Sequence, residues 1–328
     1  MTSATASSTS PARPASRPLG SFASRALVAA VLTALFAGLV WADATHLAGA
    51  PAGCWLLPAA LLAAGAGAAE AVALTTPQRR GRQSLAAVLG ATAIVVAGFL
   101  GAHAIDRGGL PDPLAGLGSV SVAVCIAIAL AFAVEISGYR SGGGALARAA
   151  AGSLAAICLG MPFAFMLGLR LVRFEHAWHE PRGANPLDTL LPLVSFVAVV
   201  KAGDIAAYLF GSLLGRTRMA PILSPGKTWE GALAGLAGSV ATAWLVLELL
   251  GPSAVGPQRP WGGWPVYGLL LGSAGIVGDL CESLVKRECG IKDSGRWLGG
   301  LGGMLDLVDS LLLAAPVAWL LWMAGRSL

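Results

Sequence analysis

The chain has few charged residues. Only 12% of its 328 residues are Asp, Glu, Lys or Arg, whereas soluble domains have about 25%. The mean hydropathy is +0.73, and apolar runs recur along the whole sequence. These features exclude a soluble globular fold, and they equally exclude a soluble domain carried by a single membrane anchor.

Cysteine is also scarce, and the spacing of the cysteines matches no disulfide or metal-binding pattern. The five residues Cys54, Cys125, Cys158, Cys281 and Cys289 include no CxxC pair. Three of them lie in apolar runs, where cysteine behaves as a small hydrophobic residue. The sequence therefore predicts neither a disulfide framework nor a zinc site.

Clustered basic residues interleaved with aromatics are absent too, although the net charge is +5. On a membrane protein such an excess is typical of loops facing lipid headgroups. No nucleic-acid partner is predicted. The partner indicated by composition is the bilayer itself.

Nine apolar segments each approach the roughly 20 residues that a helix needs to cross hydrocarbon. The sequence therefore predicts an all-α, polytopic integral membrane protein with about nine transmembrane helices. The predicted spans are 25–45, 52–74, 84–104, 115–136, 145–169, 187–212, 231–251, 264–282 and 305–325. Most of the 44 glycines are interpreted as helix-packing positions, because small residues let helices approach closely in lipid.

Three regions are predicted along the chain. Residues 1–22, rich in Ser, Thr, Ala and Pro, are a disordered cytoplasmic tail. Residues 23–186 are N-terminal membrane helices, and residues 187–328 are a C-terminal catalytic membrane domain. The first apolar run also resembles a signal peptide, but a retained helix is the preferred interpretation.

Lysine and arginine indicate the orientation. With the N-terminus in the cytoplasm, 15 of the 22 Lys and Arg residues lie inside, six lie outside, and Lys201 falls within a span. Such a bias is typical of cytoplasmic loops. The two most polar loops, 215–230 and 283–304, would then face the compartment that contains nucleotides.

Acidic residues concentrate in the last third. Nine of the 17 fall between Asp204 and Asp309, several of them in apolar spans, where charge is costly and indicates function. On a helix, Asp279, Glu282, Ser283 and Lys286 share one face. Asp306 and Asp309 lie one turn apart at the start of the last span, after a basic, glycine-rich turn.

This combination suits a phosphate substrate. Mg²⁺ is commonly held by one or two carboxylates together with substrate phosphates, and lysines and arginines neutralise a phosphate chain. The alternative for Asp306 and Asp309 taken singly is an ordinary acid at a helix start.

The segment from Ser283 to Asp309 resembles the phosphatidate cytidylyltransferase (CDP-diacylglycerol synthase) signature. It reads SLVKRECGIKDSG, then Leu298-Gly299, Gly302-Gly303-Met304 and DLVD. Two upstream stretches resemble further motifs of that family, Ser224–Gly231 (SPGKTWEG) and Asp204–Gly211 (DIAAYLFG). The match is that of a divergent member, because Leu301 and Leu307 stand where the family usually has His and Arg.

The resemblance implies that CTP and phosphatidate react to give CDP-diacylglycerol and pyrophosphate, in phospholipid biosynthesis at the inner (plasma) membrane. It implies Mg²⁺ on Asp279 and Asp306, with room for a second cation, and it leaves a homodimer open. The implied catalytic residues are Lys286, Arg287, Lys292 and Asp293. The implied substrate-binding residues are Ser224, Lys227, Thr228, Glu230, Asp204, Glu282, Ser283 and Asp309.

Several residues also have plainer interpretations. Ser224-Pro225-Gly226 is not part of a P-loop, because that motif requires a glycine five residues before Gly226 and the residue there is Pro221. Without the resemblance, the Ser-Pro-Gly sequence indicates a turn that caps the seventh helix. Lys201 and Asp204 are either a local ion pair or substrate-facing. His176 and His179 are interpreted as residues of a solvated loop. Glu70, Glu135 and Glu248 are interpreted as acids at the membrane interface.

Rival functions remain open. A related CTP-dependent lipid enzyme, such as a prenol kinase or an archaeal-type lipid cytidylyltransferase, fits the same residues. Leu301 and Leu307 favour a catalytically weakened homologue. A transporter is disfavoured, because the acids crowd into one third of the chain and no pair of related halves is visible.

Overall fold

Most of the described part of the protein is helical. The computed structural model describes residues 20–76, 80–105, 115–139, 143–172, 190–249, 259–291, 294–295 and 302–325. Within these residues, nine helices are long and apolar enough to cross a membrane, which confirms the predicted all-α polytopic fold. Most of the proposed tail 1–22 lies outside the described part, and the division into two membrane regions stays a prediction.

The elements follow the predicted order. The described helices are α1 (Gly20–Ala44), η1 (Leu47–Gly49), α2 (Leu57–Thr75), α3 (Arg80–Ile105), α4 (Ala115–Ser137), α5 (Ala145–Arg170), α6 (Leu191–Leu214), α7 (Trp229–Trp244), the π-helical turn η5 (Leu245–Leu249), α8 (Gly263–Glu288) and α9 (Met304–Gly325). Two short strands, β1 (Arg218–Ala220) and β2 (Ser224–Thr228), lie between α6 and α7.

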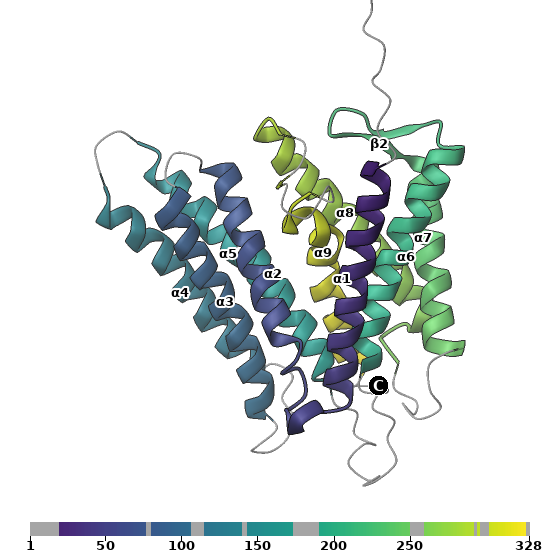
Figure 1. The fold of residues 1–328 in the computed structure, drawn as a ribbon, viewed down its shortest axis with the longest axis horizontal. Helices are drawn as coiled ribbons and strands as arrows, with labels where there is room; N and C mark the ends of the chain where they lie inside the picture. The colour runs from purple at the N-terminus through teal and green to yellow at the C-terminus, as the bar shows by residue number, and fades with distance from the viewer. Residues whose placement is uncertain are drawn as a thin grey trace, which may run out of the picture.

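The helices form two groups joined through α9. In Figure 1, α2 to α5 stand together on one side and α6 to α8 on the other. Helix α9 packs against α8 and also contacts α5 and α2. The apolar core runs through both groups, from Ala64 in α2 to Trp322 in α9. The last helix therefore couples the N-terminal helices to the polar residues of the C-terminal third.

Small residues set the close packing of α6 against α7, as predicted. A Cβ added to Gly235 would lie 3.0 Å from the Cβ of Ala207, and one added to Gly238 would lie 2.7 Å from the Cβ of Ala206. Neither distance leaves room for a larger side chain. These glycines therefore serve helix contact inside the bilayer.

The polar segment between α6 and α7 is a β-hairpin, which the sequence did not predict. β1 and β2 pair antiparallel, with Ala220 opposite Ser224 and Arg218 opposite Thr228. The residue that caps α7 is Thr228, whose hydroxyl accepts a hydrogen bond from Gly231 N at 3.1 Å. The interpretation of Ser224 as part of a capping turn is therefore wrong, since Ser224 belongs to β2.

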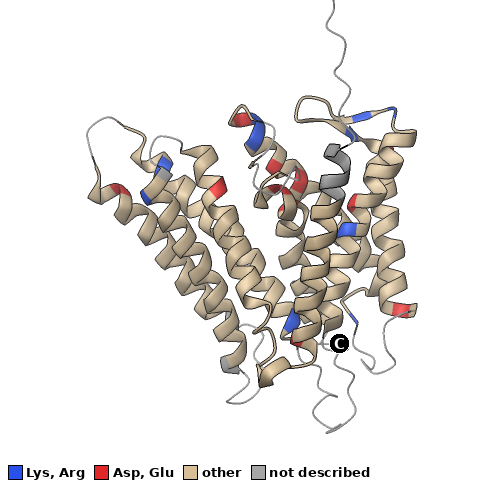
Figure 2. Ribbon diagram, viewed as in Figure 1, with Lys and Arg blue, Asp and Glu red and all other residues tan. Residues whose placement is uncertain are grey.

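Charged residues lie mainly towards the two ends of the bundle, where Figure 2 colours them on the ribbon. At one end, the C-terminus of α8, the start of α9 and the hairpin bring acids and bases together. At the other, the guanidinium of Arg170 lies 2.5 Å from Asp43, and the two side chains are 3% and 0% exposed. Asp43 also accepts from the amides of Gly53 and Trp55, so this pair ties the end of α1 to α5.

Candidate active site

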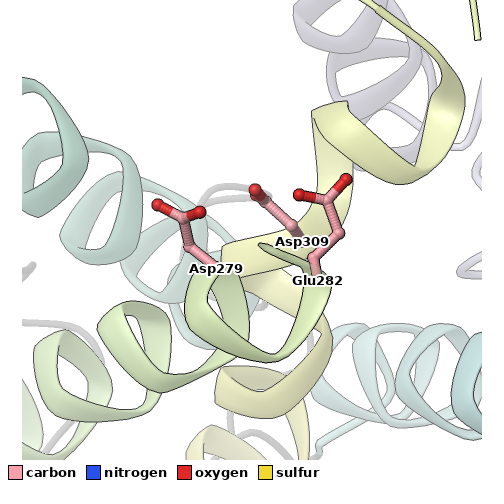
Figure 3. Close-up of side chains that lie close together, drawn as sticks. All are labelled: Asp279, Glu282 and Asp309. Atoms are coloured by element: carbon pink, nitrogen blue, oxygen red, sulfur yellow. The ribbon is translucent and has the colours of Figure 1, made fainter. Parts of the chain in front are cut away.

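Helices α8 and α9 meet at Gly278. A Cβ at this position would lie 2.6 Å from the carbonyl oxygen of Asp309, so the two backbones are in direct contact. This crossing brings Asp279, Glu282 and Asp309 together. One carboxylate oxygen from each lies within 4.8 Å of the others, and Figure 3 shows the three groups around a common space. We call these three residues the carboxylate centre.

Because the centre depends on this crossing, Gly278→Ala is expected to separate α9 from α8 and to lower activity at least about tenfold, with an overpacking cost of about 1–3 kcal/mol. The matched control is Gly38→Ala in α1, where an added Cβ meets nothing within 4 Å. Turnover and thermal unfolding of the two purified variants measure the effect. Equal behaviour of the two would contradict the assigned crossing.

Lys286 joins two carboxylates that lie on different helices. Its ammonium lies 2.5 Å from Glu282 one turn earlier on α8 and 2.8 Å from Asp306 Oδ1 on α9. Both acids are almost fully covered, with side chains 3% and 11% exposed. The predicted shared face of α8 is thus real, and Lys286 offsets the negative charge between the two helices.

Asp306 organises the turn that enters α9. Its Oδ2 accepts from the amide of Ser294 at 2.9 Å, from the hydroxyl of Ser294 at 2.7 Å and from the amide of Gly303 at 2.7 Å. Asp309 joins Asp279 and Glu282 in the carboxylate centre, whereas Asp306 meets Glu282 through their shared contact with Lys286. The metal role of Asp279 and Asp306 stays a prediction, and the carboxylate centre is an alternative ligand set that includes Asp279.

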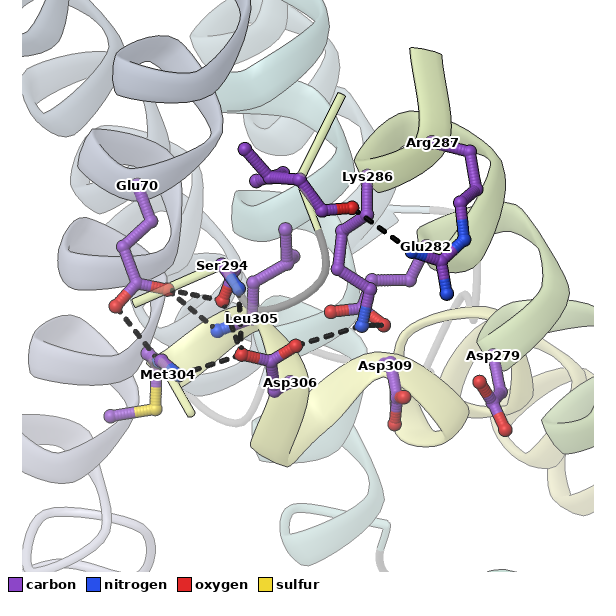
Figure 4. Close-up of polar contacts among 12 residues, drawn as sticks. Glu70, Asp279, Glu282, Lys286, Arg287, Ser294, Met304, Leu305, Asp306 and Asp309 are labelled. Atoms are coloured by element: carbon purple, nitrogen blue, oxygen red, sulfur yellow. Dashed lines mark hydrogen bonds and ion pairs between the residues drawn. The ribbon is translucent and has the colours of Figure 1, made fainter. Parts of the chain in front are cut away.

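Glu70, on α2, is a residue of this region that sequence reasoning missed. Its carboxylate accepts from the amides of Met304 and Leu305, both at 2.9 Å, and from the hydroxyl of Ser294 at 3.2 Å (Figure 4). It therefore caps the start of α9 from more than 200 residues away. Gly303 leaves space for this contact, since an added Cβ would meet the Glu70 carboxylate.

Removing this cap should disturb the centre from a distance. Glu70→Ala leaves the amides of Met304 and Leu305 at the start of α9 without an acceptor, and each such donor costs about 1–3 kcal/mol. We expect turnover to fall about 10- to 100-fold while the protein still inserts, because a small displacement of catalytic groups is costly. The pyrophosphate release that the resemblance implies, followed with purified protein, measures this effect. Activity equal to that of the control Glu248→Ala, at the far end of the bundle, would refute the capping role.

The hairpin presents one cation to the centre. Lys227 on β2 lies 2.7 Å from Asp279, with side chains 21% and 39% exposed respectively. Arg287 is directed elsewhere: its Nε donates to Leu223 O at 3.1 Å and its Nη1 to Ile291 O at 3.2 Å. Arg287 therefore holds the hairpin against the end of α8. Lys227 is the predicted basic residue that the hairpin brings into contact with the carboxylate centre.

Two other predicted substrate-binding residues near the hairpin, Glu230 and Thr228, have structural contacts. Glu230 accepts from the amides of Arg216 and Thr217, at 3.2 and 3.1 Å, which closes the base of the hairpin. Thr228 is buried as the cap of α7. Ser224 is partly exposed on β2, and Ser283 is buried in α8. Their substrate roles stay predictions.

Asp204 lies at the α6 side of the site. It receives the ammonium of Lys201 at 3.2 Å, so the local ion pair exists. It also accepts from the hydroxyl of Ser310 on α9, at 2.8 Å. The pair is therefore more than local, because it reaches the residue next to Asp309.

Some predicted residues lie outside the described part of the chain: Lys292, Asp293, Arg296, Leu301, His176 and His179. Leu307, by contrast, is described. Its side chain packs against the apolar core. The position at which the resemblance led us to expect Arg therefore contributes to packing in this chain.

Fold and site together define a polytopic membrane protein whose described part contains a charged centre, made of carboxylates and lysines where α8, α9 and the hairpin meet. The family model described as "Cytidylyltransferase family" matches residues 23–324. The chain belongs to this family, which confirms the resemblance drawn from the motifs between Asp204 and Asp309.

Curated relatives match a shorter stretch. Similarity to the phosphatidate cytidylyltransferase of Brucella suis is 46% identity over 141 residues, covering 42% of this chain and 49% of the relative. The phosphatidate cytidylyltransferase of Haemophilus influenzae is 36% identical over 152 residues, which cover 46% of this chain and 51% of the relative. The uncharacterized protein YnbB of Escherichia coli is 41% identical over 127 residues, which cover 39% of this chain and 41% of the relative. The matched stretch thus spans about half the length of these relatives.

Proposed function

We propose that the protein transfers the cytidylyl group of CTP to phosphatidate, giving CDP-diacylglycerol and pyrophosphate. The observation that carries this proposal is the carboxylate centre with Lys227 and Lys286 beside it, in a chain that matches the family over residues 23–324. The names of the curated relatives support the same reaction.

In this reaction a phosphate oxygen of the lipid attacks the α-phosphorus of CTP, and the bond to the bridging oxygen breaks as pyrophosphate leaves. A phosphate monoester is largely ionised at neutral pH, so no strong general base is needed. The protein's task is to position two anions and offset their charge. Lys227, on the exposed hairpin, is placed to exchange its ion pair with Asp279 for a phosphate of CTP.

The donors of the centre fit a hard divalent cation. They are carboxylate oxygens only, the type that Mg²⁺ prefers. Glu282 is buried and forms an ion pair with Lys286 at 2.5 Å, but neither of its oxygens accepts a hydrogen bond of good geometry in the described part of the chain. Asp279, Glu282 and Asp309 would hold the ion, which supplies positive charge to the triphosphate when bound. The loop with Lys292 and Asp293 is proposed to contact the same phosphates.

The centre is proposed to face the cytoplasm, with the protein in the inner (plasma) membrane. Fifteen of the 22 Lys and Arg residues fall on the side of the N-terminus in the predicted topology. The hairpin and the end of α8 belong to that side, where CTP is present.

The proposal is tested with CTP labelled at one phosphorus. Purified protein is incubated with phosphatidate and Mg²⁺, and label is measured in the lipid. Label from the α-position in the lipid, and none from the γ-position, is the expected result. Label from the γ-position would identify a lipid kinase, and CTP binding without pyrophosphate release would identify a silent homologue; either result would overturn the proposal.

A further inference from the structure

Lys201 is a lysine within an apolar helix. It lies near the middle of α6, and its side chain is only 36% exposed. A charged side chain at such a depth is costly and is kept where it has a partner and a task. The task is not evident from the family motifs, which begin at Asp204.

The contacts of Lys201 use all three N–H donors of its ammonium. Its ammonium donates to Asp204 Oδ2 at 3.2 Å, to Ser310 Oγ at 2.9 Å and to Leu307 O at 3.4 Å. A lysine has three N–H donors, so none is left for a substrate phosphate. Lys201 therefore acts on other residues of the protein and not on CTP directly.

These contacts lead to the carboxylate centre. Ser310 accepts from Lys201, donates its hydroxyl to Asp204, and donates its amide to Asp309 Oδ1 at 2.6 Å. The ammonium thus holds the turn of α9 that carries Asp309 against α6. The other two lysines of the site serve its other side: Lys227 pairs with Asp279, and Lys286 with Glu282 and Asp306.

We propose, on the basis of the function proposed above, that Lys201 is a positioning residue and a fixed positive charge for the carboxylate centre. It orients Asp309 through Ser310 and reduces the negative charge at the α6 edge. The centre then binds a divalent cation less tightly than its carboxylates alone would, and holds it in the geometry that turnover requires. The positive charge that an Arg at 307 would supply comes here from α6, beside the carbonyl of Leu307.

A plain structural role makes a different prediction. An ion pair three residues apart on one helix, both partners about one third exposed, stabilises a helix by about 0.2–0.5 kcal/mol. Its loss would lower the stability slightly and leave the affinity for a divalent cation unchanged.

The test compares Lys201→Met, Lys201→Gln and Lys201→Arg with the wild-type protein, using Mn²⁺ binding followed by electron paramagnetic resonance in detergent. Removing the positive charge is expected to tighten Mn²⁺ binding on the order of tenfold in the Met and Gln variants. Turnover should fall at least about tenfold while KM for CTP changes less than about threefold. Lys201→Arg should keep its Mn²⁺ affinity within about threefold of the wild-type value, because its charge is retained.

The matched control is Arg259→Met, which removes a partly exposed ion pair with Glu248 at the far end of the bundle. It should leave Mn²⁺ affinity unchanged. The inference is overturned if the Met and Gln variants bind Mn²⁺ as the wild-type protein does or more weakly, if the control shows the same shift, or if the wild-type protein binds no Mn²⁺. A Mn²⁺ shift without any transfer of label to lipid would instead count against the proposed function and leave the role of Lys201 intact.

Discussion

Asp279→Asn is expected to lower cytidylyl transfer about a hundredfold to a thousandfold, the size of effect expected when one preorganised group that stabilises developing charge is removed. Asp279 is the partner of Lys227 and a member of the carboxylate centre. The amide keeps the shape of the side chain but loses the negative charge. Turnover is measured as pyrophosphate released by purified protein, and Mn²⁺ binding is measured alongside it.

The matched control is Glu248→Gln. Both acids are 39% exposed and both form one ion pair, Asp279 with Lys227 and Glu248 with Arg259. The control should retain activity within about twofold, since exposed ion pairs contribute little. Normal turnover in Asp279→Asn would remove the carboxylate centre from the reaction.

Lys286→Met is expected to lower both activity and stability. It leaves Glu282, only 3% exposed, and Asp306 without their shared cation. Breaking a buried ion pair on one side costs about 3–5 kcal/mol, because the remaining charge stays buried. We expect a clear drop in the thermal unfolding temperature and a loss of turnover of at least about a hundredfold.

Lys286→Arg separates charge from shape, and Arg259→Met is the control for losing a partly exposed ion pair. The Arg variant should recover most of the stability but little of the turnover, because a guanidinium cannot occupy the position of the ammonium between two carboxylates. If Lys286→Met unfolded at the temperature of Arg259→Met, the bridging role would be refuted.

The fold was largely readable from the sequence, because each span is an apolar run of the length that hydrocarbon requires. The helical face of α8 was equally readable, since residues four apart lie one above the other; the contact between Glu282 and Lys286 confirms it. The contribution of α9 was harder. Asp306 and Asp309 lie one turn apart, and only the crossing at Gly278 decides which of them meets Asp279.

Two other features depend on contacts between distant segments. Glu70 was interpreted as an interfacial acid because nothing near it in the sequence indicates that it caps α9. The hairpin was missed because its strands are short and β2 contains Pro225 and Gly226, which are uncommon in strands. A single acid close to the end of an otherwise apolar span was the one available signal for Glu70.

We propose that this membrane protein forms a cytidylyl lipid at the carboxylate centre. The most direct measurement is the ratio of cytidylyl lipid formed to pyrophosphate released, with purified protein, CTP and phosphatidate. We predict one of each per turnover for the wild-type protein, and neither above background for Asp279→Asn. Pyrophosphate without cytidylyl lipid, or equal formation of both products by the two proteins, would contradict the claim.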